Sequence, residues 1–85
     1  MNNKVFVRLV VPEIDKYYDV YLPINKKIGN IAILLNKAIS EMSMEELPLS
    51  PNNKIYNVDT KEKYNPDVLL ANTNIRNGSI LVLLS

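Results

Sequence analysis

The side chains that most often perform enzymatic chemistry are missing from this 85-residue chain. It has no Cys, no His and no Trp, and it has only two glycines. Without imidazole or thiolate groups there is no Ser-His or Cys-His nucleophile pair, no thiolate or imidazole metal site and no histidine pH switch. Two glycines are too few for a phosphate-cradling loop or a dinucleotide-binding fingerprint. We therefore expect a protein that is not an enzyme, without catalytic, cofactor-binding or metal-binding residues.

The remaining candidates for acid–base chemistry are carboxylates. Glu41, Glu45 and Glu46 lie near the end of a predicted helix, and Asp59 and Glu62 lie in a predicted turn. Without His, such a pair would have to act alone in a cleft, and a domain this small is expected to lack a pocket of the usual ~300 Å³ or more. We interpret these carboxylates as solvated surface groups.

Charge and hydropathy exclude two classes of partner. Ten Lys and Arg against nine Asp and Glu leave a net charge of +1, too weak a basic field to hold nucleic acid or an anionic membrane. No apolar run approaches the ~18 residues of a membrane span, and Arg8 interrupts what would have to be a signal sequence. We expect one domain over residues 1–85 that is cytoplasmic, does not bind nucleic acid and does not insert into a membrane.

Alternating and continuous apolar runs predict the strands. They are expected at residues 5–11, 17–22, 54–58 and 80–84, with a brief return strand at 63–64. The segments 5–11 and 80–84 are apolar on both faces, which is typical of strands in the centre of a sheet.

A helical spacing follows the second strand. Asn25 is the predicted N-cap of one amphipathic helix, and its apolar stripe comprises Ile28, Ile31, Leu35, Ala38 and Met42, flanked by Leu34 and Ile39. Met42 and Met44 are expected to fill the core or its rim. Residues 44–53 contain two prolines and are predicted to be a loop.

The order of these elements favours an α+β fold. A helix that follows a hairpin can cover one face of a mixed sheet, with the last strand beside the first in the centre. This is the β-grasp arrangement, here a four- to five-stranded mixed sheet with one main helix packed on one face.

Several spacings along the chain resemble those of ubiquitin-like proteins. The gaps between Leu22, Ile28, Ile31 and Leu35 are similar to the strand-to-helix core spacing of ubiquitin, and residues 70–75 (LANTNI) and 75–81 (IRNGSIL) resemble its later segments. Within that superfamily, residues 18–23 (YDVYLP) and 77–84 (NGSILVLL) resemble the bacterial YukD/EsaB group.

The resemblance implies a function. It implies a cytosolic accessory or regulatory factor of the type VII (WXG100) secretion system in Gram-positive bacteria, which binds a secretion ATPase or the cytosolic region of a membrane component. It implies no catalytic residue. Conjugated ubiquitin-like proteins and sulfur carriers end in a Gly-Gly tail, whereas this sequence ends in Leu83, Leu84 and Ser85, so we do not expect tagging or sulfur transfer.

One face of the predicted sheet is a candidate interaction surface. Burying an unpaired charge is costly, so Arg8 and Asp19 are expected to point away from the helix, together with the other residues of the same alternation. The predicted protein-binding face comprises Phe6, Arg8, Val10, Tyr17, Tyr21, Tyr56, Ile80 and Val82. Apolar, tyrosine-rich patches of this kind often mark interaction sites. The alternatives are a homodimer that buries this face and scattered surface residues without a partner.

Overall fold

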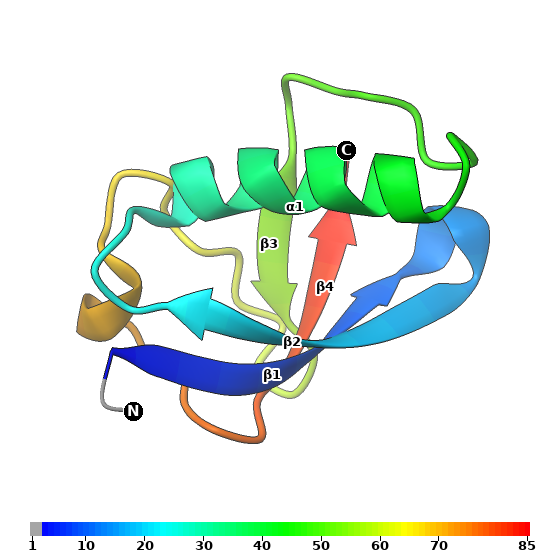
Figure 1. The fold of residues 1–85 in the computed structure, drawn as a ribbon. Coiled ribbons are helices and arrows are strands. Elements are labelled where there is room, and N and C mark those ends of the chain that lie inside the picture. The colour runs from blue at the N-terminus through cyan, green and yellow to red at the C-terminus, as the bar shows by residue number, and fades with distance from the viewer. Residues whose placement is uncertain (1–2) are drawn as a thin grey trace.

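The structure, a computed structural model, describes residues 3–85, which form one four-stranded sheet with one α-helix packed on one of its faces (Figure 1). The elements in chain order are β1 (Lys4–Val11), the 3₁₀ helix η1 (Pro12–Ile14), β2 (Lys16–Pro23), α1 (Ile28–Met42), β3 (Lys54–Asn57), the 3₁₀ helix η2 (Leu70–Asn72) and β4 (Ile80–Leu84). The predicted strands at 5–11, 17–22, 54–58 and 80–84 and the predicted loop at 44–53 are confirmed within one or two residues.

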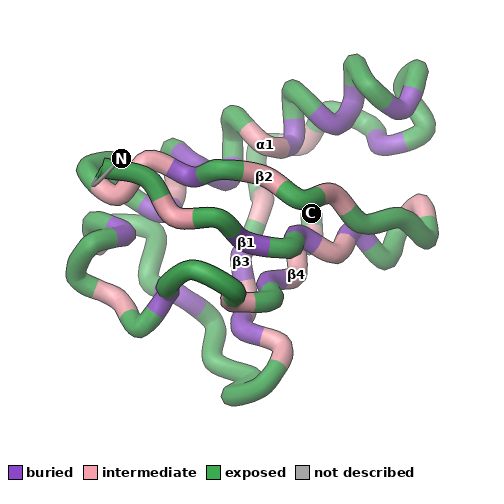
Figure 2. The backbone as a smooth tube through the Cα atoms, turned by 60° about the horizontal axis from the view of Figure 1, so that its bottom comes forward, coloured by how far each residue is buried: buried purple, intermediate pink, exposed green. Residues whose placement is uncertain are grey.

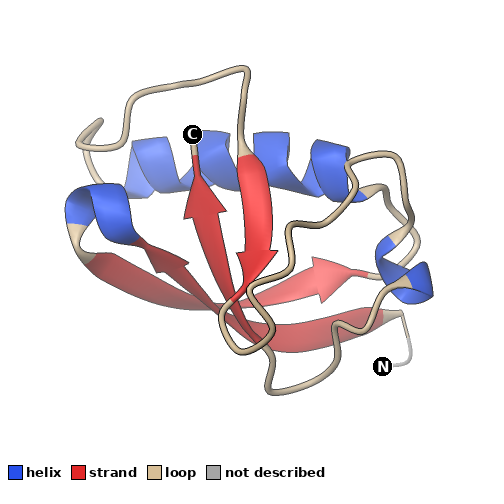
Figure 3. Ribbon diagram, turned by 180° about the vertical axis from the view of Figure 1, so that it is seen from behind, coloured by secondary structure: helices blue, strands red, loops and turns tan. Residues whose placement is uncertain are grey.

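The sheet is mixed and has the order β2-β1-β4-β3. β1 pairs antiparallel with β2 and parallel with β4, and β3 pairs antiparallel with β4. The two central strands are therefore the two segments whose sequences are apolar on both faces. Seen from behind, β4 and β3 lie in front of α1 (Figure 3), so the helix covers one face of the sheet and leaves the other.

The predicted return strand at 63–64 is reduced to a single bridge. Lys63 bridges Tyr56, and the N–H of Tyr64 donates a hydrogen bond to the carbonyl of Ile55 at 3.0 Å. The sheet in the described residues therefore has four strands rather than five.

More buried and more exposed residues alternate along the strands (Figure 2). Val7, Leu9 and Val11 of β1 are fully buried under α1, while their sequence neighbours point away from it. Ile55 of β3 and Leu81 and Leu83 of β4 face the helix in the same way, with at most 1% of each residue exposed. The direction of each strand's side chains, predicted from the charges of Arg8 and Asp19, is confirmed.

The buried face of α1 is rotated relative to the predicted stripe. Ala38 and Met42 are exposed, so their assignment to the core was wrong, and Asn36, Ser40 and Ser43 are buried instead. The amide of Asn36 donates to the carbonyl of Pro48 at 3.2 Å and accepts from the N–H of Ser50 at 3.0 Å. A polar residue can face inward here because the loop after the helix satisfies it.

The loop at 44–53 explains the other wrong core assignment. Met44 and Glu45 have φ angles of 54° and 69°, so the chain leaves the helix in the left-handed region and Met44 is left 90% exposed. The loop then inserts Leu47 into the core, where only 1% of it is exposed. Leu47 is therefore part of the core, whereas Met42 and Met44 lie at the surface.

The start of α1 also differs from the prediction. The N-cap residue is Lys27, not Asn25, and no side chain caps the helix. The carbonyls of Val68 and Pro66 accept hydrogen bonds from the N–H groups of Ile28 and Gly29, both at 2.9 Å. Distant backbone thus satisfies donors that a capping side chain normally satisfies.

Candidate protein-binding face

The residues of the predicted face lie together on the sheet surface opposite α1, which we call the outer sheet face. The strand register places them in cross-strand rows. Phe6 lies beside Tyr21. Arg8 lies between Asp19 and Ile80. The longest row runs from Tyr17 through Val10 and Val82 to Tyr56. Within each row, residues that are far apart in the sequence become neighbours because they occupy matched positions on adjacent strands.

The outer sheet face is substantially exposed and rich in apolar side chains. Tyr21, Tyr17, Phe6 and Ile80 are 68%, 58%, 40% and 36% exposed, whereas Val10, Tyr56 and Val82 are half-buried among their neighbours. Large apolar residues in contact on one open face are a common feature of interaction sites. The exposure that the sequence predicted for this face is therefore present in the structure.

Arg8 and Asp19 form an ion pair in the middle of this face. Arg8 Nε donates to Asp19 Oδ1 at 2.9 Å and a second guanidinium nitrogen donates to Asp19 Oδ2 at 3.2 Å. The hydrogen bond from Arg8 lowers the pKa of Asp19, and the same bond raises the pKa of Arg8. The guanidinium also lies 4.2 Å from the centre of the Tyr17 ring, a cation–π distance. The charges therefore compensate one another instead of interrupting the apolar surface.

Aromatic contact continues the face on the other side of this pair. The rings of Phe6 and Tyr21 have centroids 5.0 Å apart and are tilted by 53°, within the range of favourable aromatic pairs. The backbone of Phe6 is tied to the turn before β4, because its N–H donates to Asn77 Oδ1 and its carbonyl accepts from Gly78 N–H, both at 2.8 Å. Gly78 has a φ angle of +91°, which accounts for glycine at this position.

Two shallow hollows flank the Arg8 side chain. One, of about 230 Å³, is lined by Phe6, Arg8, Asp19, Gly78 and Ile80. The other, of about 290 Å³, is lined by Arg8, Val10, Pro12, Asp15, Lys16 and Tyr17. Both lie below the ~300–1,000 Å³ typical of small-molecule sites. Their size suits single side chains of a docking protein better than an enclosed cofactor.

The described residues contain neither a candidate metal site nor a candidate membrane span. Residues 3–85 contain no group of three or more Asp or Glu side chains that could hold a metal ion. Within the same residues, no helix has the length and apolar character needed to cross a bilayer.

The surface carboxyl of Glu13 has a lowered pKa because it accepts hydrogen bonds from Ser85. This contact joins η1 to the residue that follows β4.

No protein-family model matches this sequence, and no curated protein matches it either. Solved structures do match. A chain of an ESX-5 inner membrane complex aligns with 96% of this chain at a TM-score of 0.77 and 18% identity. The ubiquitin-like domain of the type VII secretion protein EccD1 from Mycobacterium tuberculosis aligns with 96% of this chain at 0.73 and 15%, over 98% of its own length.

A third matching structure is also a ubiquitin-like domain of an EccD protein. The ubiquitin-like domain of EccD5 from Mycobacterium xenopi aligns with 95% of this chain and 92% of its own length, with a TM-score of 0.75 and 19% identity. The chain has a ubiquitin-like β-grasp fold. It spans only 21% of the matched ESX-5 chain, and identities this low establish the fold alone. The resemblance to the YukD/EsaB group in particular stays a prediction.

Proposed function

We propose that this protein is a ubiquitin-like binding module of a type VII secretion system, neither an enzyme nor a conjugated modifier. It acts in the cytoplasm, as an accessory factor of the YukD/EsaB type in a Gram-positive bacterium. Its outer sheet face docks onto a larger protein of the system, either the secretion ATPase or the cytosolic region of a membrane component. The similarity to ubiquitin-like domains of type VII components supports the system.

The observation that carries the docking proposal is the pairing of Arg8 with Asp19 inside an exposed apolar face. Burying an unpaired charge at an interface is costly, whereas a pair that stays hydrogen-bonded can be buried with a much smaller penalty. The aromatic side chains around the pair supply large contact area at a low cost in conformational entropy. The face is therefore suited to a protein surface that is apolar and carries little net charge.

The proposal against conjugation rests on composition. The two glycines, Gly29 and Gly78, are far apart, so the 85 residues contain no Gly-Gly pair for an activating enzyme to use. Intact-mass measurement after incubation with ATP and a ubiquitin-like activating enzyme is expected to show no adduct. Formation of an adenylate, a thiocarboxylate or a conjugate would contradict this part of the proposal.

Affinity capture from cells that express a type VII system tests the docking proposal. Tagged wild-type protein is expected to capture a component of the system, and the Tyr21→Glu variant, which places a charge beside Phe6, is expected to lose it. Leu34→Glu is the matched control, because Leu34 is a similarly exposed apolar residue, 55% exposed, on α1. Capture of every partner by a folded Tyr21→Glu variant would contradict docking through this face.

A homodimer that buries the outer sheet face is the competing arrangement. Sedimentation velocity at high micromolar concentration distinguishes a homodimer from a monomer whose outer sheet face is free to dock. A monomer is expected, and a wild-type dimer that Tyr21→Glu dissociates would replace the docking proposal.

A further inference from the structure

Asn77 and Gly78 form the only Asn-Gly pair in the sequence, and both residues are exposed. An asparagine that precedes glycine is prone to lose its side-chain amide, because glycine has no side chain to hinder attack of its backbone nitrogen on the amide carbon. Every other asparagine of the chain precedes a larger residue. This pair is therefore the position where spontaneous deamidation is chemically easiest.

The pair occupies the two central positions of a four-residue turn before β4. Ser79 N–H donates to the carbonyl of Arg76 at 3.0 Å, and Arg76 N–H donates to Ser79 Oγ, also at 3.0 Å. Gly78 has a φ angle of +91°, close to the value that a type II turn requires at its third residue. The turn therefore fixes the backbone on both sides of the Asn77–Gly78 peptide bond.

Phe6 of β1 holds both of the groups that would react. Its N–H donates to Asn77 Oδ1, and its carbonyl accepts from Gly78 N–H, both at 2.8 Å. Deamidation requires the Asn77 side chain to rotate toward Gly78, and it requires the Gly78 nitrogen to lose its proton and attack. The first movement breaks one of these hydrogen bonds and the second breaks the other. The contact with Phe6 therefore opposes the reaction as long as the turn stays on β1.

We propose that Asn77 is a deamidation site that its contact with Phe6 keeps closed in the folded domain. When the turn opens, the Gly78 nitrogen attacks Cγ of Asn77. The new C–N bond closes a succinimide ring, and the side-chain nitrogen leaves as ammonia with the proton that Gly78 loses. Water then adds to one of the two ring carbonyls. Opening of the ring on one side leaves aspartate at this position, and opening on the other side leaves isoaspartate.

The two products differ in their contact with Phe6. Aspartate keeps a side-chain oxygen where Asn77 Oδ1 lies, so it still accepts from Phe6 N–H. Isoaspartate routes the backbone through the former side chain, which lengthens the turn and removes this acceptor. Phe6 and Gly78 also line the hollow of about 230 Å³ on the outer sheet face, so isoaspartate alters that face. The modification site itself does not depend on the proposed docking there.

Deamidation rates in folded and unfolded chains test the closed state. The protein and the capped peptide acetyl-Ile-Arg-Asn-Gly-Ser-Ile-Leu-amide, which is residues 75–81 without β1, are incubated in the same mildly alkaline buffer. Peptide mapping by mass spectrometry follows Asn77. The folded protein is expected to react at least about tenfold more slowly than the peptide, because only the opened turn reacts. Equal rates would overturn the proposal.

The protein unfolded in guanidinium chloride gives the second comparison. It is expected to deamidate at Asn77 before any other asparagine, at a rate close to that of the peptide. Earlier reaction at another asparagine would overturn the assignment of the site.

Two hydroxyl variants separate the turn from general loosening. Ser79→Ala removes the acceptor of Arg76 N–H and leaves Gly78 in place, so the folded variant is expected to deamidate about threefold faster or more. Thr60→Ala is the matched control, because Thr60 Oγ1 accepts from Glu62 N–H in a different turn, and it is expected to deamidate at the wild-type rate. Equal rates for the two folded variants would overturn the role of the turn.

Amide hydrogen exchange of the purified products tests the consequence. The isoaspartate form is expected to lose protection at the Phe6 and Gly78 amides, whereas the Asn77→Asp variant is expected to keep it. Wild-type protection at Phe6 in the isoaspartate form would overturn the proposed contact.

Discussion

Arg8 on β1 and Asp19 on β2 face each other directly across the two strands and are joined by hydrogen bonds of 2.9 and 3.2 Å. They are the charged residues that break the apolar run of their strands, and the fold brings them into register with each other. The charges that made the outer face recognisable in the sequence therefore also neutralise one another in the structure. This is the feature that lets an apolar, tyrosine-rich surface stay compatible with docking.

Removing one member of the Arg8–Asp19 pair should impair docking more than removing both members. Asp19→Ala leaves the Arg8 guanidinium unpaired, and its burial against a partner should lower partner capture by about tenfold or more. The double variant Arg8→Leu with Asp19→Leu should retain most of the capture, since no charge is left to desolvate. Quantitative mass spectrometry of captured material compares the two. Equal capture by Asp19→Ala and wild type would show that the pair is not buried on docking.

Gly29→Ala should destabilise the fold, although Ala is the better helix former by ~1 kcal/mol. A Cβ at this position would lie 3.0 Å from Pro66 Cβ and 3.1 Å from the Pro66 carbonyl oxygen. Overpacking of this kind costs ~1–3 kcal/mol. Urea unfolding should therefore give a lower free energy of unfolding, while Asn30→Ala, the exposed neighbour on α1, should be neutral or slightly stabilising. A Gly29→Ala variant as stable as Asn30→Ala would refute the close approach.

Tyr64→Phe should destabilise the loop beside β3. The Tyr64 hydroxyl donates to Asn74 Oδ1 at 2.5 Å and accepts from Asn57 Nδ2 at 3.0 Å. Removing it leaves the buried amide of Asn57 without this partner, at a cost of ~1–3 kcal/mol. Chemical denaturation of both proteins at neutral pH measures the difference. An unchanged free energy of unfolding would contradict the role assigned to this hydroxyl.

The same residue predicts a response to alkaline pH. Burial raises the pKa of Tyr64 above the ordinary value of 10.0, so the folded state favours the neutral phenol. This contribution to stability is complete below pH 10 and is lost as the pH rises from there through the folded-state pKa. Thermal melting from about pH 8 to about pH 11 should show a steeper alkaline decline for wild type than for Tyr64→Phe. Parallel declines would show that Tyr64 is not the group responsible.

Asn36→Ala should loosen the loop after the helix. It removes the hydrogen bonds to Pro48 and Ser50 and leaves the Ser50 N–H without that acceptor. Amide hydrogen exchange should accelerate at Ser50 and around Leu47, with a loss of ~1–3 kcal/mol in global stability. Ala substitution of Lys37, the exposed neighbour, should change neither. Unchanged exchange at Ser50 in Asn36→Ala would contradict this account.

The sheet and its outer face could be predicted from the sequence because a strand needs only a period of two. Once the charged side chains of Arg8 and Asp19 are placed on the solvent side, alternation fixes the direction of all the remaining side chains on β1 and β2. The rotation of α1 could not be predicted in this way. It depends on Asn36 and Leu47, whose burial is decided by a loop that returns from outside the helix. Periodicity within the helix contains no information about that loop.

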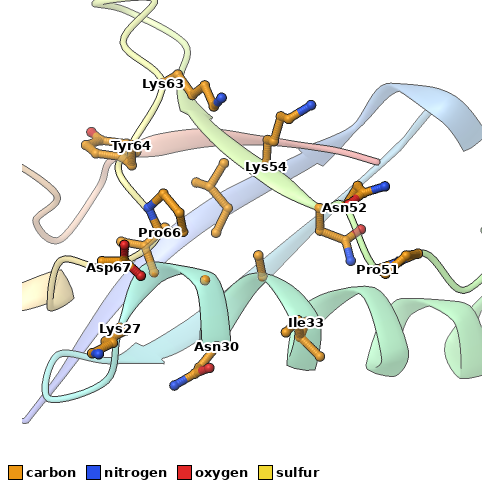
Figure 4. A pocket seen from close by; sticks show the side chains of 15 residues that line it. Lys27, Asn30, Ile33, Pro51, Asn52, Lys54, Lys63, Tyr64, Pro66 and Asp67 are labelled. Carbon is orange, nitrogen blue, oxygen red and sulfur yellow. The ribbon is translucent and has the colours of Figure 1, made fainter.

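A groove of about 580 Å³ lies between α1 and β3 (Figure 4), so the expectation that a domain this small lacks a pocket above ~300 Å³ was wrong. Its walls come from three separate segments, which only the fold brings together. One signal was present in the sequence. Gly29 lies inside a helical pattern, where glycine is costly, and a packing contact is one reason for a glycine to be kept there. The approach of Pro66 is the reason for Gly29, and the groove opens beside it.

The docking of the outer sheet face is tested most directly by site-specific photo-crosslinking in cells that carry a type VII secretion system. A photoreactive p-benzoylphenylalanine replaces Tyr17 or Tyr21 on the outer sheet face, or Leu34 on α1, and the crosslinked products are identified by mass spectrometry. We predict a crosslink to an ATPase or membrane component of the secretion system from Tyr17 and Tyr21, and none from Leu34. Crosslinks to such a component from Leu34, with none from either tyrosine, would contradict docking through the outer sheet face.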